Sequence, residues 1–255
     1  MQIRLNRPYA LNEQGRRDSS EDGIFPEKGA AAVDNRFFLV CDGVGGHEKG
    51  EVASRTVCEA FAAFLGSADL TDFDETFFDK ALEYAYVWLD KADTESGERK
   101  MGTTLTFACF HSRGVFAAHI GDSRIYHLRR QGSRADILYK SGDHSIVGEL
   151  IRAGVITAEE AATHPKKNVV TRVMQPNQEI PAKADVYETN DLSAGDYFFL
   201  CTDGILESVS DELLCDIAGR DIDDESKMKE IHKACLDGSH DNYSAYLIPV
   251  GGVID

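Results

Sequence analysis

The chain has 255 residues, of which 42% are hydrophobic and 28% charged, a composition typical of one compact globular domain or at most two small ones. Its 44 acidic and 27 basic residues give a formal net charge of −17, which excludes sequence-independent binding to nucleic acid or an anionic membrane, because both need clustered Lys and Arg. No stretch reaches the roughly 18 apolar residues of a membrane-spanning helix, and the N-terminal residues do not resemble an export signal, so we expect a cytoplasmic protein.

The first half of the chain alternates between strand and helix patterns. A short buried strand is predicted over 37–41, ending in Asp42-Gly43. Apolar residues then recur at helical spacing over 57–64 and over 77–88, which predicts two amphipathic helices that cover one sheet. Short strands separated by turns follow at 103–110, 115–120, 124–128 and 136–139. They are too closely spaced for crossover helices, so we expect them to pair antiparallel.

A segment of different character occupies about 143–175. A short helix over 146–151 stops at Gly154, and a second begins at the capping box Thr157-x-x-Glu160 and ends before His164-Pro165. We interpret this segment as a small helical insertion beside the main body.

The last part of the chain repeats the earlier pattern. A strand over 197–201 is followed by Asp203-Gly204, helices are predicted over 210–218 and 228–236, and a final strand over 243–248. Strands and helices are segregated without a regular βαβ alternation, so the fold class is α+β, with antiparallel sheet stacked under helices. No repeat or low-complexity linker divides the chain, which favours a single domain over 1–255.

The six cysteines lie far apart, mostly inside apolar runs, and none forms the C-x-x-C spacing of a zinc or redox site. We expect free, buried thiols in a reducing compartment. None stands beside an obvious activating His or Arg, which disfavours a catalytic cysteine.

Acidic residues gather at the ends of the predicted strands rather than on helix faces. The residues concerned are Glu21, Asp22, Asp42, Asp122, Asp203 and Asp241. Carboxylates brought together there would repel one another unless a hard divalent cation, Mg²⁺ or Mn²⁺, neutralised them. The clusters lack His and Cys, which speaks against zinc. Solvated turn residues explain any single one of these acids better than a metal ion does. The two apolar strands that end in Asp-Gly weigh against that interpretation, and spacing alone leaves the two evenly balanced.

The glycine-rich stretch after Asp42 lacks the G-x-G-x-x-G pattern and the P-loop pattern, so nucleotide binding is disfavoured. These glycines would instead let the backbone approach an ion, with the Gly43 carbonyl as a neutral oxygen ligand beside the Asp42 carboxylate.

Seven motifs occur in one consistent order along nearly the whole chain: Arg17-Asp18-Ser19-Ser20-Glu21-Asp22, Asp42-Gly43-Val44-Gly45-Gly46-His47, Gly102-Thr103-Thr104, Gly121-Asp122-Ser123-Arg124, Asp143-His144-Ser145 through His164-Pro165, Thr202-Asp203-Gly204 and Asp241-Asn242. Together they resemble the metal-dependent Ser/Thr protein phosphatases of type 2C, in particular the compact bacterial members. Each motif alone is weak, but seven in register make chance agreement implausible.

The resemblance implies two stacked antiparallel sheets between helix pairs, an α-β-β-α sandwich, with a helical flap at about 143–175. It also implies a site with two Mn²⁺ or Mg²⁺ ions. Asp42 would bridge the ions, Asp22, the Gly43 carbonyl, Asp203 and Asp241 would complete the shell, Glu21 would hold a metal-bound water, and Asp122 would serve a third, weaker ion. Arg17 matches the arginine that grips the substrate phosphate, although the residue by itself looks like an ordinary surface arginine.

The implied reaction is hydrolysis of phosphoserine and phosphothreonine in substrates of a Ser/Thr kinase, by water activated between the two ions and without a covalent phosphoenzyme. The implied oligomeric state is a monomer. Ser20 stands where the family motif has Asn, and Val44 stands where many eukaryotic relatives carry a His proposed as general acid. A metal-bound water is the favoured replacement for that acid, with His47 as the alternative. Two rival functions remain, a non-catalytic phosphoprotein-binding scaffold and a metallohydrolase of small phosphoesters.

Overall fold

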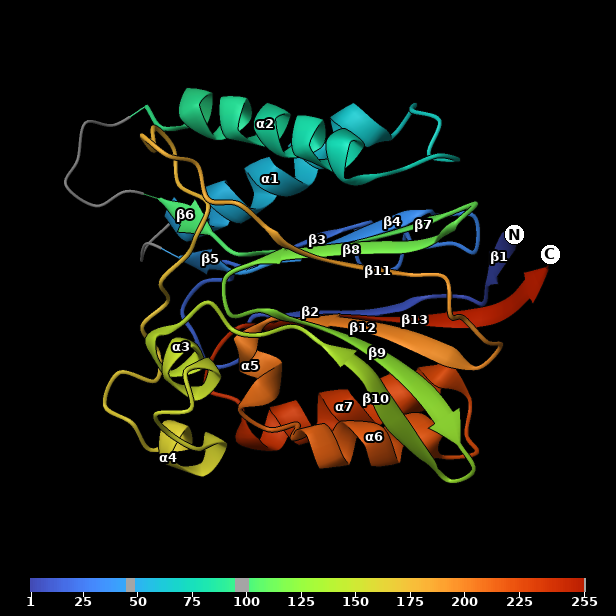
Figure 1. Ribbon diagram of the computed structural model, residues 1–255. Coiled ribbons are helices and arrows are strands. Elements are labelled where there is room, and N and C mark those ends of the chain that lie inside the picture. Colours follow the sequence, from blue (N-terminus) through green and yellow to red (C-terminus); the bar gives the residue numbers. More distant parts are fainter. Residues whose placement is uncertain (45–48, 95–100, 255) are drawn as a thin grey trace.

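The computed structural model describes residues 1–44, 49–94 and 101–254. Its strands form two large antiparallel sheets, stacked face to face with helices on both outer faces (Figure 1). The strands are β1 (Gln2–Leu5), β2 (Tyr9–Glu13), β3 (Gly23–Phe25), β4 (Phe37–Cys41), β5 (Gly43–Val44), β6 (Gly102–Thr103), β7 (Leu105–His111), β8 (Gly114–Ile120), β9 (Arg124–Gln131), β10 (Arg134–Lys140), β11 (Asp185–Thr189), β12 (Asp196–Cys201) and β13 (Tyr243–Ile254). The helices are α1 (Lys49–Leu65), α2 (Glu75–Ala92), α3 (Ile146–Arg152), α4 (Ala158–Ala162), α5 (Asp203–Leu206), α6 (Asp211–Gly219) and α7 (Asp224–Gly238).

One sheet has the strand order β11-β8-β7-β4-β3, and the other has the order β1-β13-β12-β9-β10, with β2 also paired to β13. Helices α1 and α2 cover the first sheet, and α6 and α7 cover the second (Figure 1). The α+β class and the α-β-β-α layering are therefore confirmed. Among the helices of the described ranges, none combines the length and the apolar character that a bilayer span requires.

Strand β4 shows why its sequence reads as one continuous apolar run. Side chains alternate between the two faces of a strand. Phe37, Leu39 and Cys41 pack in the core under α1 and α2, whereas Phe38 and Val40 pack in the core between the two sheets. Both faces are buried, so no polar residue interrupts the pattern.

The expectation that neighbouring strands in the region 103–139 all pair with each other was wrong at one place. Strand β8 pairs with β7 and β11 in one sheet, while β9 pairs with β10 and β12 in the other. The chain between them, 121–123, therefore crosses from sheet to sheet instead of forming a hairpin. Sequence spacing shows how short this connection is, but it does not show which sheet each strand joins. Both strands are largely buried, so their apolar patterns fit either sheet.

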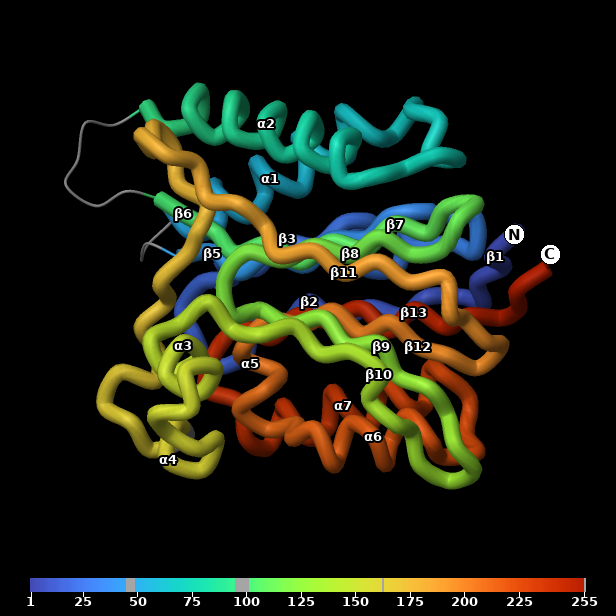
Figure 2. Tube along the Cα trace, in the orientation of Figure 1, coloured from blue at the N-terminus to red at the C-terminus, as the bar shows by residue number. Residues whose placement is uncertain are grey.

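The insertion predicted at about 143–175 contains both expected helices. The Ser145 side chain caps α3 by accepting the Gly148 N–H, and Thr157 and Glu160 form the predicted capping box of α4. After the insertion the chain runs along the ends of both sheets towards α2 before it enters β11 (Figure 2). Its place there is fixed by the Tyr86 hydroxyl, which donates to the Ala182 carbonyl at 3.1 Å.

Candidate metal centre

The aspartates that the sequence places at strand ends meet at one end of the stacked sheets. Asp22 lies just before β3, Asp42 just after β4, Asp122 between β8 and β9, Asp203 at the start of α5 directly after β12, and Asp241 two residues before β13. The turn predicted at Asp203 is thus the first turn of a short helix, with Thr202 as its N-cap residue. Antiparallel pairing within the two sheets brings these distant segments together.

The pKa values of these carboxyls show how closely they are packed. Burial raises the pKa of Asp22 and of Asp122 to about 7, and the negative charge of Asp203 acts on both in the same direction. Burial also raises the pKa of Asp42 well above its usual range, with the charges of Asp22 and Asp203 as the next contributions. Burial and mutual repulsion disfavour the ionised form of these carboxyls, and a bound divalent cation is the kind of group that offsets both effects.

Two carboxylate oxygens test whether a cation fits. Oδ1 of Asp22 and Oδ1 of Asp203 are buried and have no hydrogen-bond partner among the described residues. Buried polar atoms rarely lack a partner, so these two oxygens fit a bound cation. The donor set consists of carboxylate and carbonyl oxygens, which suits Mg²⁺ or Mn²⁺ better than zinc.

The backbone of Asp42 is held by the Gly102-Thr103-Thr104 motif. Its N–H donates to the Thr104 Oγ1 at 2.9 Å, and its carbonyl accepts hydrogen bonds from the Thr103 Oγ1 at 2.9 Å and the Thr104 N–H at 2.8 Å. These contacts leave the carboxylate of Asp42 as the part of the residue that is available to an ion.

Gly43 lies where three chain segments meet. A Cβ atom at this position would lie 2.3 Å from the Gly50 carbonyl oxygen and 2.5 Å from that of Glu21, so no larger residue fits. The Gly43 N–H donates to the Glu21 carbonyl at 3.2 Å. The glycine belongs to the short β5–β6 ladder rather than to an open turn, and it places Glu21 beside Asp42.

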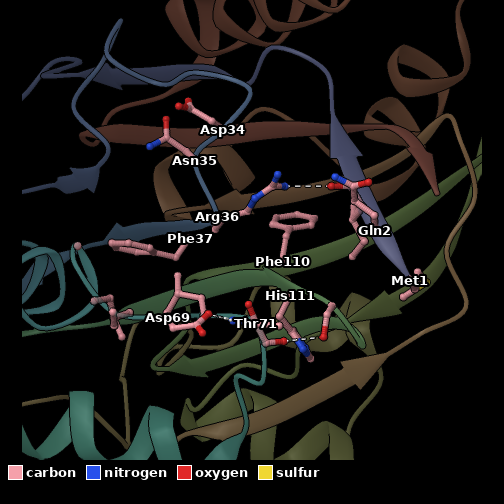
Figure 3. A pocket seen from close by; sticks show the side chains of 16 residues that line it. Met1, Gln2, Asp34, Asn35, Arg36, Phe37, Asp69, Thr71, Phe110 and His111 are labelled. Atoms are coloured by element: carbon pink, nitrogen blue, oxygen red, sulfur yellow. Dashed lines mark hydrogen bonds between the residues drawn. The ribbon is translucent and has the colours of Figure 1, made fainter. Parts of the chain in front are cut away.

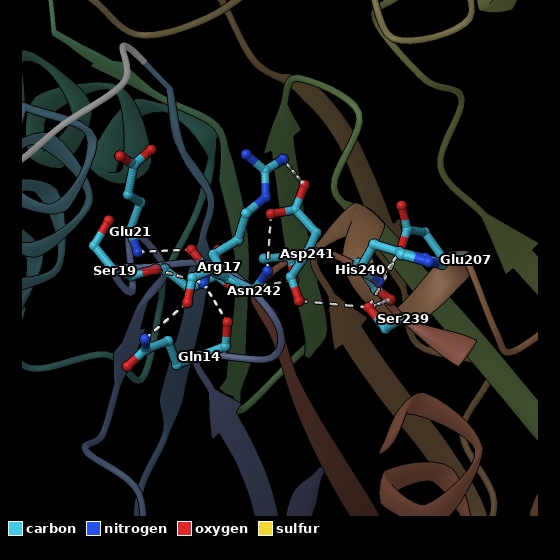
Figure 4. Close-up of polar contacts among 12 residues, drawn as sticks. Gln14, Arg17, Ser19, Glu21, Glu207, Ser239, His240, Asp241 and Asn242 are labelled. Atoms are coloured by element: carbon cyan, nitrogen blue, oxygen red, sulfur yellow. Dashed lines mark hydrogen bonds and ion pairs between the residues drawn. The ribbon is translucent and has the colours of Figure 1, made fainter. Parts of the chain in front are cut away.

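Arg17 stands at the rim of the cluster. Its Nη2 donates to Asp241 Oδ2 at 2.7 Å, and its side chain is 60% exposed (Figure 4). The hydrogen bond and charge of Asp241 raise the pKa of Arg17, and the charges of Glu21 and Asp203 add to this effect. A guanidinium that faces both solvent and the carboxylates is placed to meet an anion arriving from outside.

Asn242 is a site residue to which the sequence analysis gave no role. Its Oδ1 accepts the Glu21 N–H at 2.8 Å, and its Nδ2 donates to the carbonyls of Gln14 at 2.7 Å and Ser19 at 2.8 Å (Figure 4). The amide thus fixes the segment that carries Arg17, Glu21 and Asp22. The motif Asp241-Asn242 was the available signal, but a sequence does not show which backbone groups an amide reaches.

Both ends of the insertion at 143–175 are attached beside the aspartates. At its start, Arg124 donates to the two carboxylate oxygens of Asp143, each at 2.7 Å, two residues from Asp122. At its end, Met174 and Thr103 exchange two backbone hydrogen bonds of 2.9 Å, next to the threonine that supports Asp42. The insertion therefore begins and ends at the candidate site. The sequence analysis did not predict the Arg124–Asp143 ion pair.

Val44 stands where many eukaryotic relatives carry the proposed general acid, and His47 is the alternative acid in this chain. Val44 is half-buried in β5 and carries no ionisable group. His47 lies outside the described residues.

The structure also has a cavity of about 470 Å³ that is separate from the aspartate cluster of the candidate metal centre (Figure 3). Its lining includes Arg36, Phe37, Thr71 and His111. Phe37 begins β4, whereas Asp42 follows the other end of that strand, so the cavity and the cluster lie about 15 Å apart along the sheet.

A carboxylate cluster at one end of an α-β-β-α sandwich, with buried oxygens that no described residue contacts by a hydrogen bond, is the arrangement of a divalent-cation site. Comparison with known proteins agrees. The family model described as protein phosphatase 2C matches residues 20–236. Protein phosphatase PhpP of Streptococcus pneumoniae is 32% identical over 188 residues, covering 73% of this chain and 74% of that protein. Serine/threonine phosphatase stp of Listeria welshimeri is 31% identical over 256 residues, covering 92% of each.

Solved structures show the same relationship. Serine/threonine phosphatase Stp1 from Staphylococcus aureus superposes with a TM-score of 0.82 at 27% identity, covering 99% of this chain and 98% of that one. The catalytic domain of the serine/threonine protein phosphatase PstP, solved in complex with 2 manganese ions, gives a TM-score of 0.76 at 27% identity over 98% of this chain and 99% of that one. The chain belongs to the protein phosphatase 2C family.

Proposed function

We propose that this chain is a metal-dependent phosphatase that hydrolyses phosphoserine and phosphothreonine in proteins. The observation that carries the proposal is the meeting of aspartates from five separate segments, with two buried carboxylate oxygens that have no partner within the part of the chain that the structure describes. The family membership and the serine/threonine phosphatases among the relatives support the same activity.

The residues that would hold two Mn²⁺ or Mg²⁺ ions are Asp22, Asp42, the Gly43 carbonyl, Asp203 and Asp241, with help from Glu21, and Asp122 would serve a third, weaker ion. Such ions supply positive charge that lowers the pKa of water and neutralises a phosphoryl group.

Arg17 has a separate task in this proposal. Its planar guanidinium can donate two parallel hydrogen bonds to phosphoryl oxygens, which the point charge of a lysine cannot do. In the structure one nitrogen already bonds to Asp241, which orients the group towards the cluster. The side chain therefore binds and orients the phosphate at the mouth of the site.

The substrates would be proteins phosphorylated by a cognate Ser/Thr kinase, and the flap at 143–175 would contact the polypeptide around the phosphorylated residue. The attachment of both flap ends beside Asp122 and Asp42 supports that role. We further propose a single catalytic domain that acts as a cytoplasmic monomer without nucleic-acid or membrane partners. The six free cysteines fit a reducing compartment.

The test is hydrolysis of a phosphothreonine peptide and of an aryl phosphate, with Mn²⁺ or Mg²⁺ added to protein stripped of metal. Asp42→Asn is expected to abolish turnover of both substrates, because it removes an anionic ligand. Asp221→Asn is the matched control, since the Asp221 side chain is 98% exposed and remote from the cluster. Full activity in excess chelator, or wild-type rates for Asp42→Asn, would contradict the proposal. Faster turnover of small phosphoesters than of phosphopeptides would favour the small-molecule alternative.

A further inference from the structure

Three side chains outside the aspartate cluster meet where the flap joins the first sheet. His119 is the penultimate residue of β8, His144 lies at the start of the flap and Asp185 begins β11, and their ligand atoms lie within 4.8 Å of one another. His119 and His144 are each about 1% exposed. Such a group can hold a metal ion or can hold the chain together, and the geometry distinguishes the two.

The orientation of the rings excludes a shared metal ion. The imidazoles of His119 and His144 are stacked, with centroids 4.5 Å apart and planes inclined by 11°. An ion bound to both would lie about 2.1 Å from each nitrogen and close to both ring planes, which parallel stacked rings do not allow. The Nδ1 of His144 also accepts the Gly121 N–H at 3.0 Å, so the neutral ring carries its proton on Nε2.

His144 instead bonds to the turn that carries Asp122. Its Nδ1 accepts the Gly121 N–H, and its own backbone N–H donates to the Gly121 carbonyl at 3.0 Å. Both polar groups of the Gly121 backbone are thus held by one residue. Gly121 has a φ of +105°, and a Cβ there would lie 2.5 Å from the Thr104 side chain, so only glycine fits at this position of the turn.

The same histidine bonds to the far side of the flap. Its carbonyl accepts the Thr171 N–H at 2.8 Å, which closes the flap end onto its start. Its Nε2 lies 3.0 Å from Asp185 Oδ2, a close polar contact that falls outside hydrogen-bond geometry, and Asp185 Oδ1 accepts a hydrogen bond from Arg172 at 2.5 Å. Burial lowers the pKa of His144 to about 4, so the ring remains neutral and keeps this pattern at neutral pH.

We propose that His144 is the positioning residue that sets where the flap stands over the catalytic centre, and that it thereby determines selectivity for phosphoproteins over small phosphate esters. This rests on the proposed function, in which the flap contacts the polypeptide. A small ester reaches only the metal ions and Arg17, so displacement of the flap leaves its turnover intact. A phosphopeptide uses the flap as well and loses binding when the flap moves.

The two nitrogens of His144 can be tested one at a time. In His144→Asn, the side-chain oxygen occupies the Nδ1 position and can still accept the Gly121 N–H, but nothing reaches Asp185. In His144→Gln, the side-chain nitrogen occupies the Nε2 position and keeps the polar contact with Asp185, but the Gly121 N–H loses its partner. His119→Gln is the control for loss of the stacked ring alone, because its amide can still donate to the Gly142 carbonyl that His119 contacts at 2.9 Å while both His144 nitrogens keep their contacts.

Each His144 variant is expected to lower kcat/KM for a phosphothreonine peptide about fivefold, the effect of one lost hydrogen bond, mainly through a higher KM. Aryl phosphate turnover should stay within about twofold of wild type, and amide hydrogen exchange over 146–152 should be faster. Equal losses on both substrates, or unchanged peptide kinetics, would overturn the proposal. If the wild-type protein hydrolyses the aryl phosphate but no phosphopeptide, the proposed substrate class is wrong. In that case amide hydrogen exchange over 146–152 still tests His144: unchanged exchange in both variants would show that His144 does not hold the flap.

Discussion

Asn242 shows how a residue that is no metal ligand can decide the geometry of the site. Its side-chain amide accepts one hydrogen bond from, and donates two hydrogen bonds to, backbone groups of the segment 14–21. That segment has no helix and no strand from residue 14 to residue 22, so these hydrogen bonds replace the regular structure that would otherwise hold it.

Asn242→Ala should therefore reduce both stability and activity. The Glu21 N–H and two carbonyls lose their partners, and a buried group left unsatisfied costs about 1–3 kcal/mol. We expect a loss of that size in the free energy of unfolding, measured with urea, and at least a tenfold loss of metal-dependent turnover. The exposed Asn190 supplies the control, Asn190→Ala, which should change neither quantity. Normal turnover in Asn242→Ala would mean that the segment keeps its place without the amide.

Arg17 lends itself to a comparison of two substitutions. A charge-assisted hydrogen bond contributes about 1.5–3 kcal/mol, so Arg17→Ala should raise the KM for an aryl phosphate roughly tenfold to a hundredfold. Arg17→Lys keeps the charge and loses the two-pronged geometry, so it should recover only part of the affinity. Arg16→Ala is the matched control, because Arg16 bonds to the Asp237 carbonyl on the outside of the site. A lysine variant with wild-type KM would show that charge alone is enough.

How far the site could be predicted depends on what each residue bonds to. Asp42 and Asp203 could be found because each follows a run of residues buried on both faces, a pattern visible in one sequence. Asn242, Arg124 and His144 act through backbone groups or charges in segments distant along the chain. Their partners are set by the crossing between sheets and by the flap, which no local pattern specifies.

At the scale of elements, the predictable parts are those with a strong period. Helices α1 and α2 and strands β4 and β12 carry unambiguous apolar patterns and were predicted in the right places. Strand β11 was missed, because its residues are only partly buried at the edge of a sheet and its sequence alternates weakly. The crossing between β8 and β9 was misjudged because sequence spacing carries no information about which sheet a buried strand joins.

The capping box of α4 gives a prediction at this scale. A five-residue helix is too short to be stable by itself, so its caps matter more than they would in a long helix. Thr157→Ala removes the side chain that accepts the Glu160 N–H and should weaken α4 by about 1 kcal/mol. Amide exchange over 158–162 should quicken about fivefold while the melting temperature stays constant. Thr163→Ala, at the other end of α4, is the control; equal exchange in both variants would contradict a special role for the cap.

For the whole molecule, one buried charge network joins the two sheets at the end away from the flap. Asp196 is fully buried and accepts hydrogen bonds from Arg129, through Nε at 2.9 Å and Nη2 at 2.8 Å. His127 lies between Asp196 in its own sheet and the Tyr187 hydroxyl of the other, 3.1 Å from each. The stacking of the sheets thus depends on apolar packing together with the polar contact between His127 and Tyr187, which connects one sheet to the other.

The network predicts how stability changes with pH. Burial alone would raise the pKa of Asp196, but the hydrogen bonds from Arg129 and His127 outweigh it and lower the pKa to about 2. An unfolded aspartate titrates near pH 3.9, so the stabilisation by this group is complete above about pH 4 and disappears as the pH falls towards 2.

Asp196→Asn should lower the free energy of unfolding at pH 7 by about 3 kcal/mol, because it leaves Arg129 without its buried partner, and should flatten the dependence of that free energy on pH between pH 4 and 2. Denaturant unfolding at several pH values measures both effects. Asp191→Asn is the control, since Asp191 also pairs with Arg129 but is 76% exposed, and an equal loss in the two variants would show that burial of the pair is not what stabilises the sandwich.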